Sequence, residues 1–309
     1  MKTMFMFPGQ GSQVLKMGLE VYTKYSVAKE VFHQVDDALN YKLSDIIFGD
    51  DNEKLLQTQN TQPALMAVSI AVLKSLEHES GKKALEMSNF VAGHSLGEYS
   101  ALCCSGVLSL ADAAKLLQIR GQAMAEACTK NSGGMIALLG VDIAKAQELC
   151  DIIDGIIVVA NDNSVGQIVI SGDINAIETA IAIAPEIGIK KAVKLAVNGA
   201  FHSPLMQSAQ AKLQDQIAIT KFNAPTIDII ANVTAQIATD VEQIKKLLVE
   251  QITAPVRWRE TLLNAQKMGV TKMVEIGSGK VLAGLAKRTV EGIEILSVEK
   301  IEEIEKYIL

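Results

Sequence analysis

Residues 89–101 read NFVAGHSLGEYSA and place Ser95 in a short turn directly after an apolar run. The letters FVAG predict a buried strand, and the residues that follow Ser95 predict a helix. Within this stretch, GHSLG matches the G-x-S-x-G pattern of a sharp strand-to-helix turn that exposes a nucleophilic serine. Backbone N–H groups at the start of the helix can then hold an oxyanion. Many matches to this pattern are ordinary turns, but the strand before and the helix after it favour an α/β fold with Ser95 as nucleophile over a structural turn serine.

Apolar patterns before this turn predict further elements. TMFMF at 3–7 predicts a strand that ends at Pro8, and helical spacing follows over residues 20–39. A helix is also expected over residues 60–76. We place Pro63 in its first turn, where the missing N–H does no harm.

The alternation of strand and helix continues after the turn. SLAD at 109–112 has the form of a capping box with Ser109 as N-cap, and it predicts a helix that lasts to about Ala127. IDIIANV at 227–233 and KMVEIG at 272–277 predict strands that return to the same sheet. This order favours a mostly parallel sheet covered by helices.

The segment between about 132 and 195 shows a different pattern, in the order strand, helix, strand, strand, helix, strand. This is the ferredoxin-like order. The segments TKNSGG and AVNGA flank it as linkers. We therefore predict a small domain of residues 129–196 inserted into a larger domain of residues 1–128 and 197–309.

Composition limits the function classes. The 309 residues are 49% hydrophobic and 21% charged, which predicts a globular protein with a substantial core. A net charge of −6 argues against broad binding to nucleic acid or anionic membranes, because both need a positive field. The opening MKTMFMFPGQ is too short an apolar run for a secretory signal or a membrane span. The four cysteines show neither metal-ligand spacing nor disulfide density, so we expect a cytoplasmic protein.

Two groups of basic residues stand out against this acidic background. Either group could dock an acidic partner, although most lysine clusters are merely solvated faces. The groups are Lys190, Lys191 and Lys194, and Lys280, Lys287 and Arg288.

A serine hydroxyl needs a base, normally histidine. Of the four histidines, His33 and His78 lie in predicted helices and are expected at the surface. His94 adjoins the nucleophile in the tight turn, so we expect a structural role. His202 lies in a loop just before a helix start with Ser203 as N-cap, from which its side chain can reach a cleft, and is the better base.

Arg120 lies at the edge of the apolar stripe of the helix that Ser109 opens. A guanidinium there needs an anion, and an ion pair with Glu or Asp is the commoner solution. Near a nucleophile, however, the planar fork also suits bidentate capture of a substrate carboxylate.

Several motifs in order make the chain recognisable from residue 4 to about 290. Together they resemble the malonyl-CoA:acyl carrier protein transacylases, a family shared with acyltransferase domains of polyketide synthases. The resemblance implies an α/β-hydrolase-like large domain with an inserted ferredoxin-like subdomain. The motifs are FPGQGSQ at 7–13, TQPA at 61–64, GHSLGEYSA at 93–101, Arg120, FHSPLM at 201–206 and QITAPVRW at 251–258.

The resemblance also implies roles for individual residues. Ser95 matches the acylated serine and His202 the general base. Gln251 matches a residue whose main-chain carbonyl orients the histidine, so that no second negative charge lies beside the acid group of malonate. Gln10 and Leu96 match the backbone donors of the oxyanion hole.

The substrate cleft follows from the same resemblance. Arg120 matches the arginine that pairs with the malonyl carboxylate. A bulky Phe201 before the histidine accompanies malonyl preference in related acyltransferases, so we favour malonyl over methylmalonyl. We also expect Gln62, Met124 and Asn161 to line the cleft.

The implied reaction is ping-pong transfer from malonyl-CoA, through an acyl-serine, to the phosphopantetheine thiol of acyl carrier protein in fatty acid synthesis. It requires no metal and no other cofactor. We expect a monomer that binds neither nucleic acid nor a membrane.

Two other functions fit parts of the sequence. A serine thioesterase or other hydrolase would share the serine turn and the histidine but normally has an Asp or Glu as third member. The candidates Asp162 and Asp173 lie in the inserted segment, and nothing singles them out. A degenerate scaffold would bind a carrier protein without acylation.

One departure from the family pattern is Ser278, where proline is often found.

Overall fold

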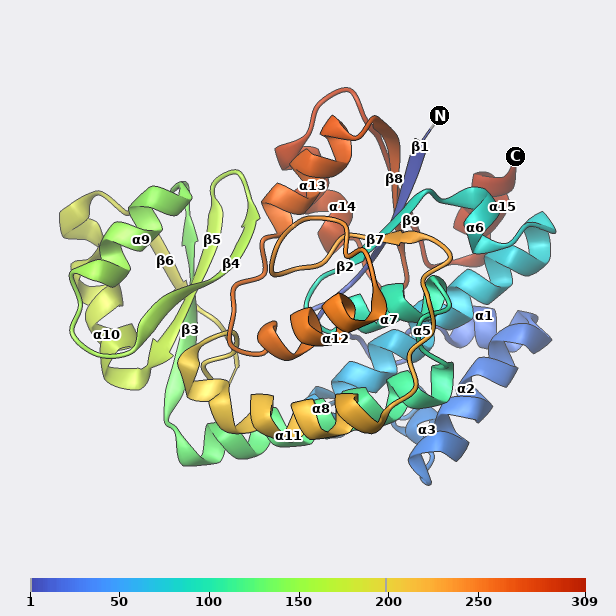
Figure 1. Cartoon of the computed structure of the whole chain (residues 1–309), viewed down its shortest axis with the longest axis horizontal. Coiled ribbons are helices and arrows are strands. Elements are labelled where there is room, and N and C mark those ends of the chain that lie inside the picture. Colours follow the sequence, from blue (N-terminus) through green and yellow to red (C-terminus); the bar gives the residue numbers. More distant parts are fainter. Residues whose placement is uncertain (1, 198) are drawn as a thin grey trace.

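The computed structural model describes residues 2–197 and 199–309, which form two sheets with helices around them (Figure 1). The larger sheet has the order β7-β2-β1-β8-β9, and every neighbouring pair is parallel. The predicted strands are confirmed, while β9 was not foreseen. The strands are β1 (Lys2–Phe7), β2 (Phe90–Gly93), β7 (Asp228–Ile229), β8 (Val270–Ile276) and β9 (Glu294–Val298).

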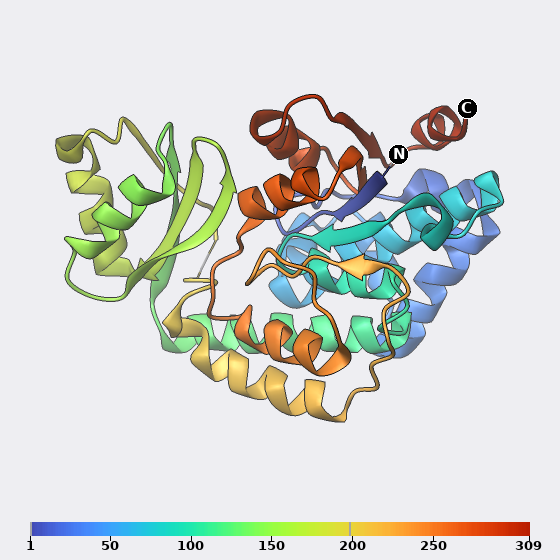
Figure 2. The same ribbon diagram turned by 45° about the horizontal axis from the view of Figure 1, so that its top comes forward.

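Both faces of this sheet are buried, as expected for a parallel sheet. In β1, the side chains of Met4 and Met6 join a core with α13 (Trp258–Lys267) and α14 (Val281–Thr289). Phe5 and Phe7 join the core on the other side. Figure 2 shows the sheet between α13 and α14 on one side and the helices of the N-terminal half of the chain on the other. Helices packed on both faces of the sheet hold the carboxyl ends of β1 and β2 in place.

The core that contains Phe5 and Phe7 is the main core, and it is built around the long helices α5 (Thr58–Ser80) and α8 (Leu110–Lys130). Almost every side chain of α5 between Asn60 and Leu76 is buried, so its apolar residues do not form a single stripe. The other helices on this side and around the edges are α1 (Leu19–Lys24), α2 (Ser26–Leu39), α3 (Leu43–Phe48), α4 (Asn52–Leu56), α6 (Ala84–Met87), α7 (Gly97–Cys104), α11 (Gln207–Ile219), α12 (Val241–Glu250) and α15 (Ile301–Ile308).

Two helix predictions need correction. The span 20–39 is divided into α1 and α2 because Tyr25 is extended, with φ −110° and ψ 124°. Helix α5 begins at Thr58, so Pro63 is its sixth residue and lies beyond the first turn. The earlier start has no side-chain cap at Gln57 and therefore left no sequence signal. The Ser109 cap is confirmed, since its side chain accepts from the Asp112 N–H.

The smaller sheet is antiparallel, with the order β4-β5-β3-β6. Together with α9 and α10 it encloses a separate apolar core. The predicted β-α-β-β-α-β order is confirmed, and so is the mixed α/β fold class. The domain boundaries at 128/129 and 196/197 stay a prediction. The elements are β3 (Gly133–Leu139), α9 (Ile143–Asp151), β4 (Ile157–Ser164), β5 (Gln167–Asp173), α10 (Ile174–Ile183), the 3₁₀ turn Ala184–Ile187 and β6 (Lys191–Lys194).

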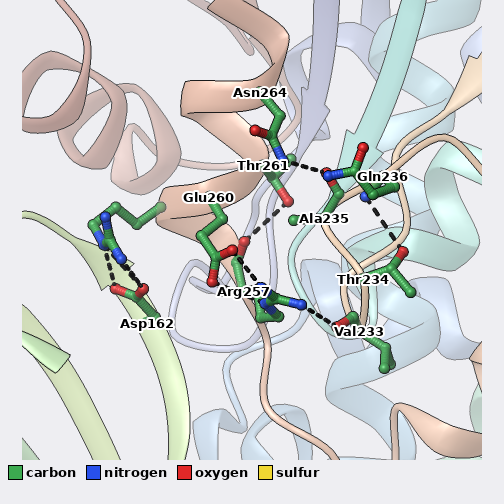
Figure 3. A network of polar contacts seen from close by, with 10 residues as sticks. Asp162, Val233, Thr234, Ala235, Gln236, Arg257, Glu260, Thr261 and Asn264 are labelled. Atoms are coloured by element: carbon green, nitrogen blue, oxygen red, sulfur yellow. Dashed lines mark hydrogen bonds and ion pairs between the residues drawn. The ribbon is translucent and has the colours of Figure 1, made fainter. Parts of the chain in front are cut away.

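Strand β4 attaches the smaller sheet to the rest of the molecule. Its Asp162 is buried and accepts two hydrogen bonds of 2.9 Å from the Arg259 Nε of α13. The Asp162 N–H also donates to the Val256 carbonyl at 3.0 Å. Figure 3 shows this ion pair beside a second one, between Arg257 and Glu260. The junction fixes β4 next to the serine turn.

Candidate active site

The turn between β2 and α7 holds Ser95 in a left-handed conformation, with φ 53°. The two flanking glycines are required because the backbone crosses itself here. A Cβ at Gly93 would collide with the Gly97 carbonyl, and one at Gly97 would collide with the Phe7 carbonyl. Strain in such a turn is typical of a functional site.

His202 completes a dyad with Ser95. Its Nε2 lies 2.9 Å from the Ser95 Oγ, and its Nδ1 lies 2.8 Å from the main-chain oxygen of Gln251. A carbonyl only accepts, so Nδ1 carries the proton and Nε2 is left to accept from the serine hydroxyl. Burial, followed by the Arg120 charge, lowers the pKa of His202 to about 3. The imidazole is therefore neutral at pH 7, and its unprotonated Nε2 faces the Ser95 hydroxyl.

Arg120 reaches the same point from α8. Its side chain is buried, and its Nη2 donates to the Ser95 Oγ at 3.0 Å and to the Gln251 Oε1 at 2.9 Å. Nη1 donates to the Gln62 Oε1 at 2.7 Å. Within residues 2–197 and 199–309, Nε has no partner and no carboxylate forms an ion pair with this guanidinium. A buried, charged and incompletely satisfied guanidinium thus touches the Ser95 hydroxyl.

The loop after β1 lies against the serine turn. A Cβ at Gly9 would stand 2.6 Å from the His94 carbonyl, so only glycine permits this approach. The N–H groups of Gln10 and Leu96 donate to no acceptor among the described residues. Ser278 lies behind this loop, and its buried hydroxyl donates to the Ser12 carbonyl at 2.8 Å.

The remaining predicted site residues lie at different depths. Gln62 and Met124 are enclosed behind Arg120 and contact each other, with 3.6 Å between Nε2 and Sδ. Phe201 packs into the main core, with 8% of its surface exposed. Asn161 is buried on β4, where its backbone bridges to Val256.

Three polar residues of the site were missed by the sequence predictions. Glu98 and Asn232 are buried beside Gln251, and Asn232 also accepts from the Ser95 N–H at 2.7 Å. Asn163 lies 2.8 Å from the Nε2 of His94, which binds the serine turn to β4. Asn232 and Asn163 end or interrupt apolar strand patterns, a signal that the sequence predictions did not use.

His33 and His78 are exposed as expected. Among the described residues, His202 forms hydrogen bonds with Ser95 and Gln251 and with neither Asp162 nor Asp173. Asp162 pairs with Arg259, whereas Asp173 caps α10. Among the described residues, the partner of the His202 Nδ1 is the Gln251 carbonyl, not a carboxylate. The described part of the chain also holds no cluster of three or more acidic, histidine or cysteine side chains suited to a metal ion.

The model of the acyl transferase domain family matches residues 4–306. The chain is 42% identical to the malonyl CoA-acyl carrier protein transacylase of Bacillus subtilis over 307 residues, covering 98% of this chain and 95% of that protein. The acyl-carrier-protein-S-malonyltransferase from Bartonella henselae superposes with a TM-score of 0.97 at 48% identity, covering 100% of this chain and 98% of that one. A malonyl-transacylase solved in complex with a type II PKS acyl-carrier protein superposes at 0.95 with 36% identity, covering 100% and 99%. The chain is an acyltransferase and belongs to the acyl transferase domain family, in the group of the malonyl CoA-acyl carrier protein transacylases.

Proposed function

We propose that this enzyme transfers the malonyl group of malonyl-CoA to the phosphopantetheine thiol of acyl carrier protein, in fatty acid synthesis. The observation that carries the proposal is the 3.0 Å contact between the Arg120 guanidinium and the Ser95 hydroxyl. A buried guanidinium without a carboxylate partner favours an acyl group that brings its own negative charge. The names of the close relatives and the complex with a carrier protein support the same donor and acceptor.

In the first half-reaction, Nε2 of His202 removes the Ser95 proton as Oγ forms a bond to the thioester carbonyl carbon. The carbonyl electron pair moves to the oxygen, where the N–H groups of Gln10 and Leu96 stabilise it. The intermediate collapses with cleavage of the carbon–sulfur bond, and His202 returns the proton to the departing CoA sulfur. Malonyl-Ser95 remains.

In the second half-reaction, the carrier thiol gives its proton to His202 and its sulfur attacks the ester carbonyl. The carbon–oxygen bond breaks, and Ser95 regains the proton from the imidazole. The Gln251 carbonyl holds the imidazole tautomer during both transfers. No step calls on a metal or another cofactor.

We assign the preference between acyl groups to the side chains around Arg120. We propose that Gln62 holds the guanidinium from behind, with Met124 packed against Gln62, while Asn161 and Phe201 shape the space beside the guanidinium. The bulk of Phe201 would crowd a methyl branch, which favours malonyl over methylmalonyl.

The carrier protein is expected to dock through positive charge. Lys190, Lys191 and Lys194 are exposed on or next to β6. In the other predicted group Lys287 is exposed, whereas Lys280 pairs with Glu303 at 2.7 Å. The first group is therefore the stronger candidate surface for an acidic partner.

Other parts of the proposal concern the whole molecule. Among the described residues, none of the helices combines the length and apolar character needed to span a membrane. We expect a cytoplasmic monomer with an inserted folding unit at residues 129–196. Limited proteolysis of the full chain checks the unit: cleavage is expected near 129–132 and 196–199, and cleavage inside β3 or β5 would contradict it.

The test of function is the mass of the intact protein. Malonyl-CoA should add one malonyl group, and holo acyl carrier protein should then remove it and gain the same mass. Methylmalonyl-CoA and acetyl-CoA are run in parallel to rank the acyl groups. Rapid loss of the adduct to water without a carrier would instead indicate a hydrolase, and carrier binding without any adduct would indicate a scaffold.

A further inference from the structure

The side-chain amide of Gln251 lies at the centre of the buried network and has a single satisfactory orientation. Its Oε1 accepts from Arg120, while its Nε2 faces Glu98 Oε2 at 2.7 Å and the Ser95 carbonyl at 3.0 Å. Asn232 Oδ1 adds a third acceptor at 3.4 Å. A flipped amide would set its NH₂ against the guanidinium and its oxygen against three acceptors, so the environment selects one state.

Glu98 provides the strongest of these restraints. Its carboxylate is buried on α7 and makes the shortest contact with the Gln251 Nε2. The same Oε2 accepts from the Asn232 N–H at 3.3 Å. Both donors converge on one oxygen, so this single acceptor atom fixes the Gln251 amide and the Asn232 backbone together.

The carboxylate does not contact Arg120 itself. Within the described ranges, no ion pair joins the two side chains, and the Gln251 amide lies between them. A direct ion pair would compensate the guanidinium charge and occupy donors that a substrate carboxylate needs. The intervening amide holds Arg120 in place and leaves its charge available.

We propose that Glu98 is a positioning residue, whose Oε2 locks the Gln251 amide so that Arg120 stays directed at the Ser95 oxygen and the acyl carboxylate. The inference rests on the proposed malonyl transfer. It assigns the effect to an acceptor atom at a fixed place, not to a negative charge in general. Burial raises the pKa of Glu98 to about 7, in keeping with an acceptor that functions even when its charge is partly lost.

Two substitutions separate placement from charge. Glu98→Gln keeps a carbonyl oxygen within reach of Gln251 and Asn232 but removes the charge. Glu98→Asp keeps the charge but withdraws the acceptor by one methylene. Ser100→Ala is the matched control, because Ser100 is buried on the same helix and its hydroxyl has no partner among the described residues.

The measurement is the single-turnover rate of adduct formation on the intact enzyme with malonyl-CoA and with acetyl-CoA, alongside thermal unfolding. Glu98→Asp should lower the malonyl rate about tenfold to hundredfold and lower the malonyl-to-acetyl ratio, since a lost hydrogen bond to a charged group has about this effect. The adduct-formation rates of Glu98→Gln and Ser100→Ala should stay within about threefold of the parent rate. A threefold change corresponds to less free energy than one hydrogen bond typically contributes.

Other outcomes overturn the inference. If Glu98→Gln forms the adduct slowly while Glu98→Asp keeps the parent rate, the effect belongs to the charge of Glu98. If both variants keep the parent rate, Glu98 has no positioning role. Equal losses for both acyl groups would mark Glu98 as merely structural. If Glu98→Asp does not fold, the ratio in Glu98→Gln decides: a retained ratio supports placement and a lost ratio refutes it. Absence of an adduct in the parent enzyme would refute the proposed transfer instead, so the two failures are distinguishable.

Discussion

The Nη2 of Arg120 lies 3.0 Å from the Oγ of Ser95, so the guanidinium and the serine hydroxyl are in direct contact inside the protein. The same nitrogen also donates to the Gln251 side chain, whose main-chain oxygen orients His202. Arg120, Ser95 and His202 all contact the one residue Gln251.

Arg120→Ala should lower the malonyl loading rate about tenfold to hundredfold, because a buried hydrogen bond to a charged group contributes about 1.5–3 kcal/mol. Acetyl loading, which needs no cation, should fall much less. Parallel adduct rates with the two CoA esters check this. Lys115→Ala removes a cation from the exposed face of the same helix and is the control. Equal losses for both acyl groups would refute the carboxylate-binding role.

Ser95→Ala should abolish the covalent adduct, since the described structure offers no equivalent nucleophile beside His202. The other candidate nucleophiles, Cys103 and Cys104, are poor thiolates: burial raises the pKa of Cys103 to about 12 and also raises that of Cys104. Intact mass after incubation with malonyl-CoA is the readout. An adduct that survives would move the nucleophile elsewhere.

The pH dependence of adduct formation should reflect the low pKa of His202. Because the folded-state pKa lies far below the ordinary 6.5, the base stays neutral as pH falls, and the acid limb should lie well below pH 6. The contribution of His202 to folding stability should decline as pH falls from about 6.5 towards about 3, since over this range the unfolded chain binds a proton that the buried imidazole does not. Single-turnover rates from pH 4 to 8 test this in the Glu98→Gln background, which removes the buried carboxyl of the site, whose pKa burial raises to about 7. An acid limb centred at 6.5 would contradict it.

Gly97→Ala should destabilise the fold by about 3 kcal/mol or prevent folding, because overpacking and backbone strain each cost about 1–3 kcal/mol. Its Cβ would overlap the Phe7 carbonyl, which is held in place because Phe7 pairs with Gly93 in the parallel sheet. Gly284→Ala is the control, since a Cβ there meets nothing within 4 Å and the residue lies in α14. That variant should gain about 0.5–1 kcal/mol. Denaturant unfolding measures both, and equal stabilities would refute the tight crossing.

Added salt should slow transfer to acyl carrier protein more than it slows acylation by malonyl-CoA, because an extended charged interface is screened more strongly than a buried contact. Lys191→Glu with Lys194→Glu should reproduce the effect on the carrier half-reaction alone. Separate rates of the two half-reactions at increasing salt are the measurement. An equal salt effect on both would argue against electrostatic docking.

Local patterns were sufficient for most elements of the fold. The apolar run before Ser95, the Ser109 cap and the β-α-β-β-α-β order all depend on neighbouring residues, and the structure confirms them. Where no local signal exists, the predictions failed: the uncapped start of α5 and the break at Tyr25 were both missed.

The sequence alone determined the chemistry available to this protein: a serine in a glycine turn, a histidine before a helix, and a single arginine on the helix that Ser109 opens. Tertiary structure decided how they meet. Ser95 and His202 are 107 residues apart, and Glu98 and Gln251 are 153 apart, so only packing of the sheet and helices brings them within hydrogen-bond distance. The role inferred for Glu98 arises from burial and from the acceptors around one amide, which no sequence spacing encodes.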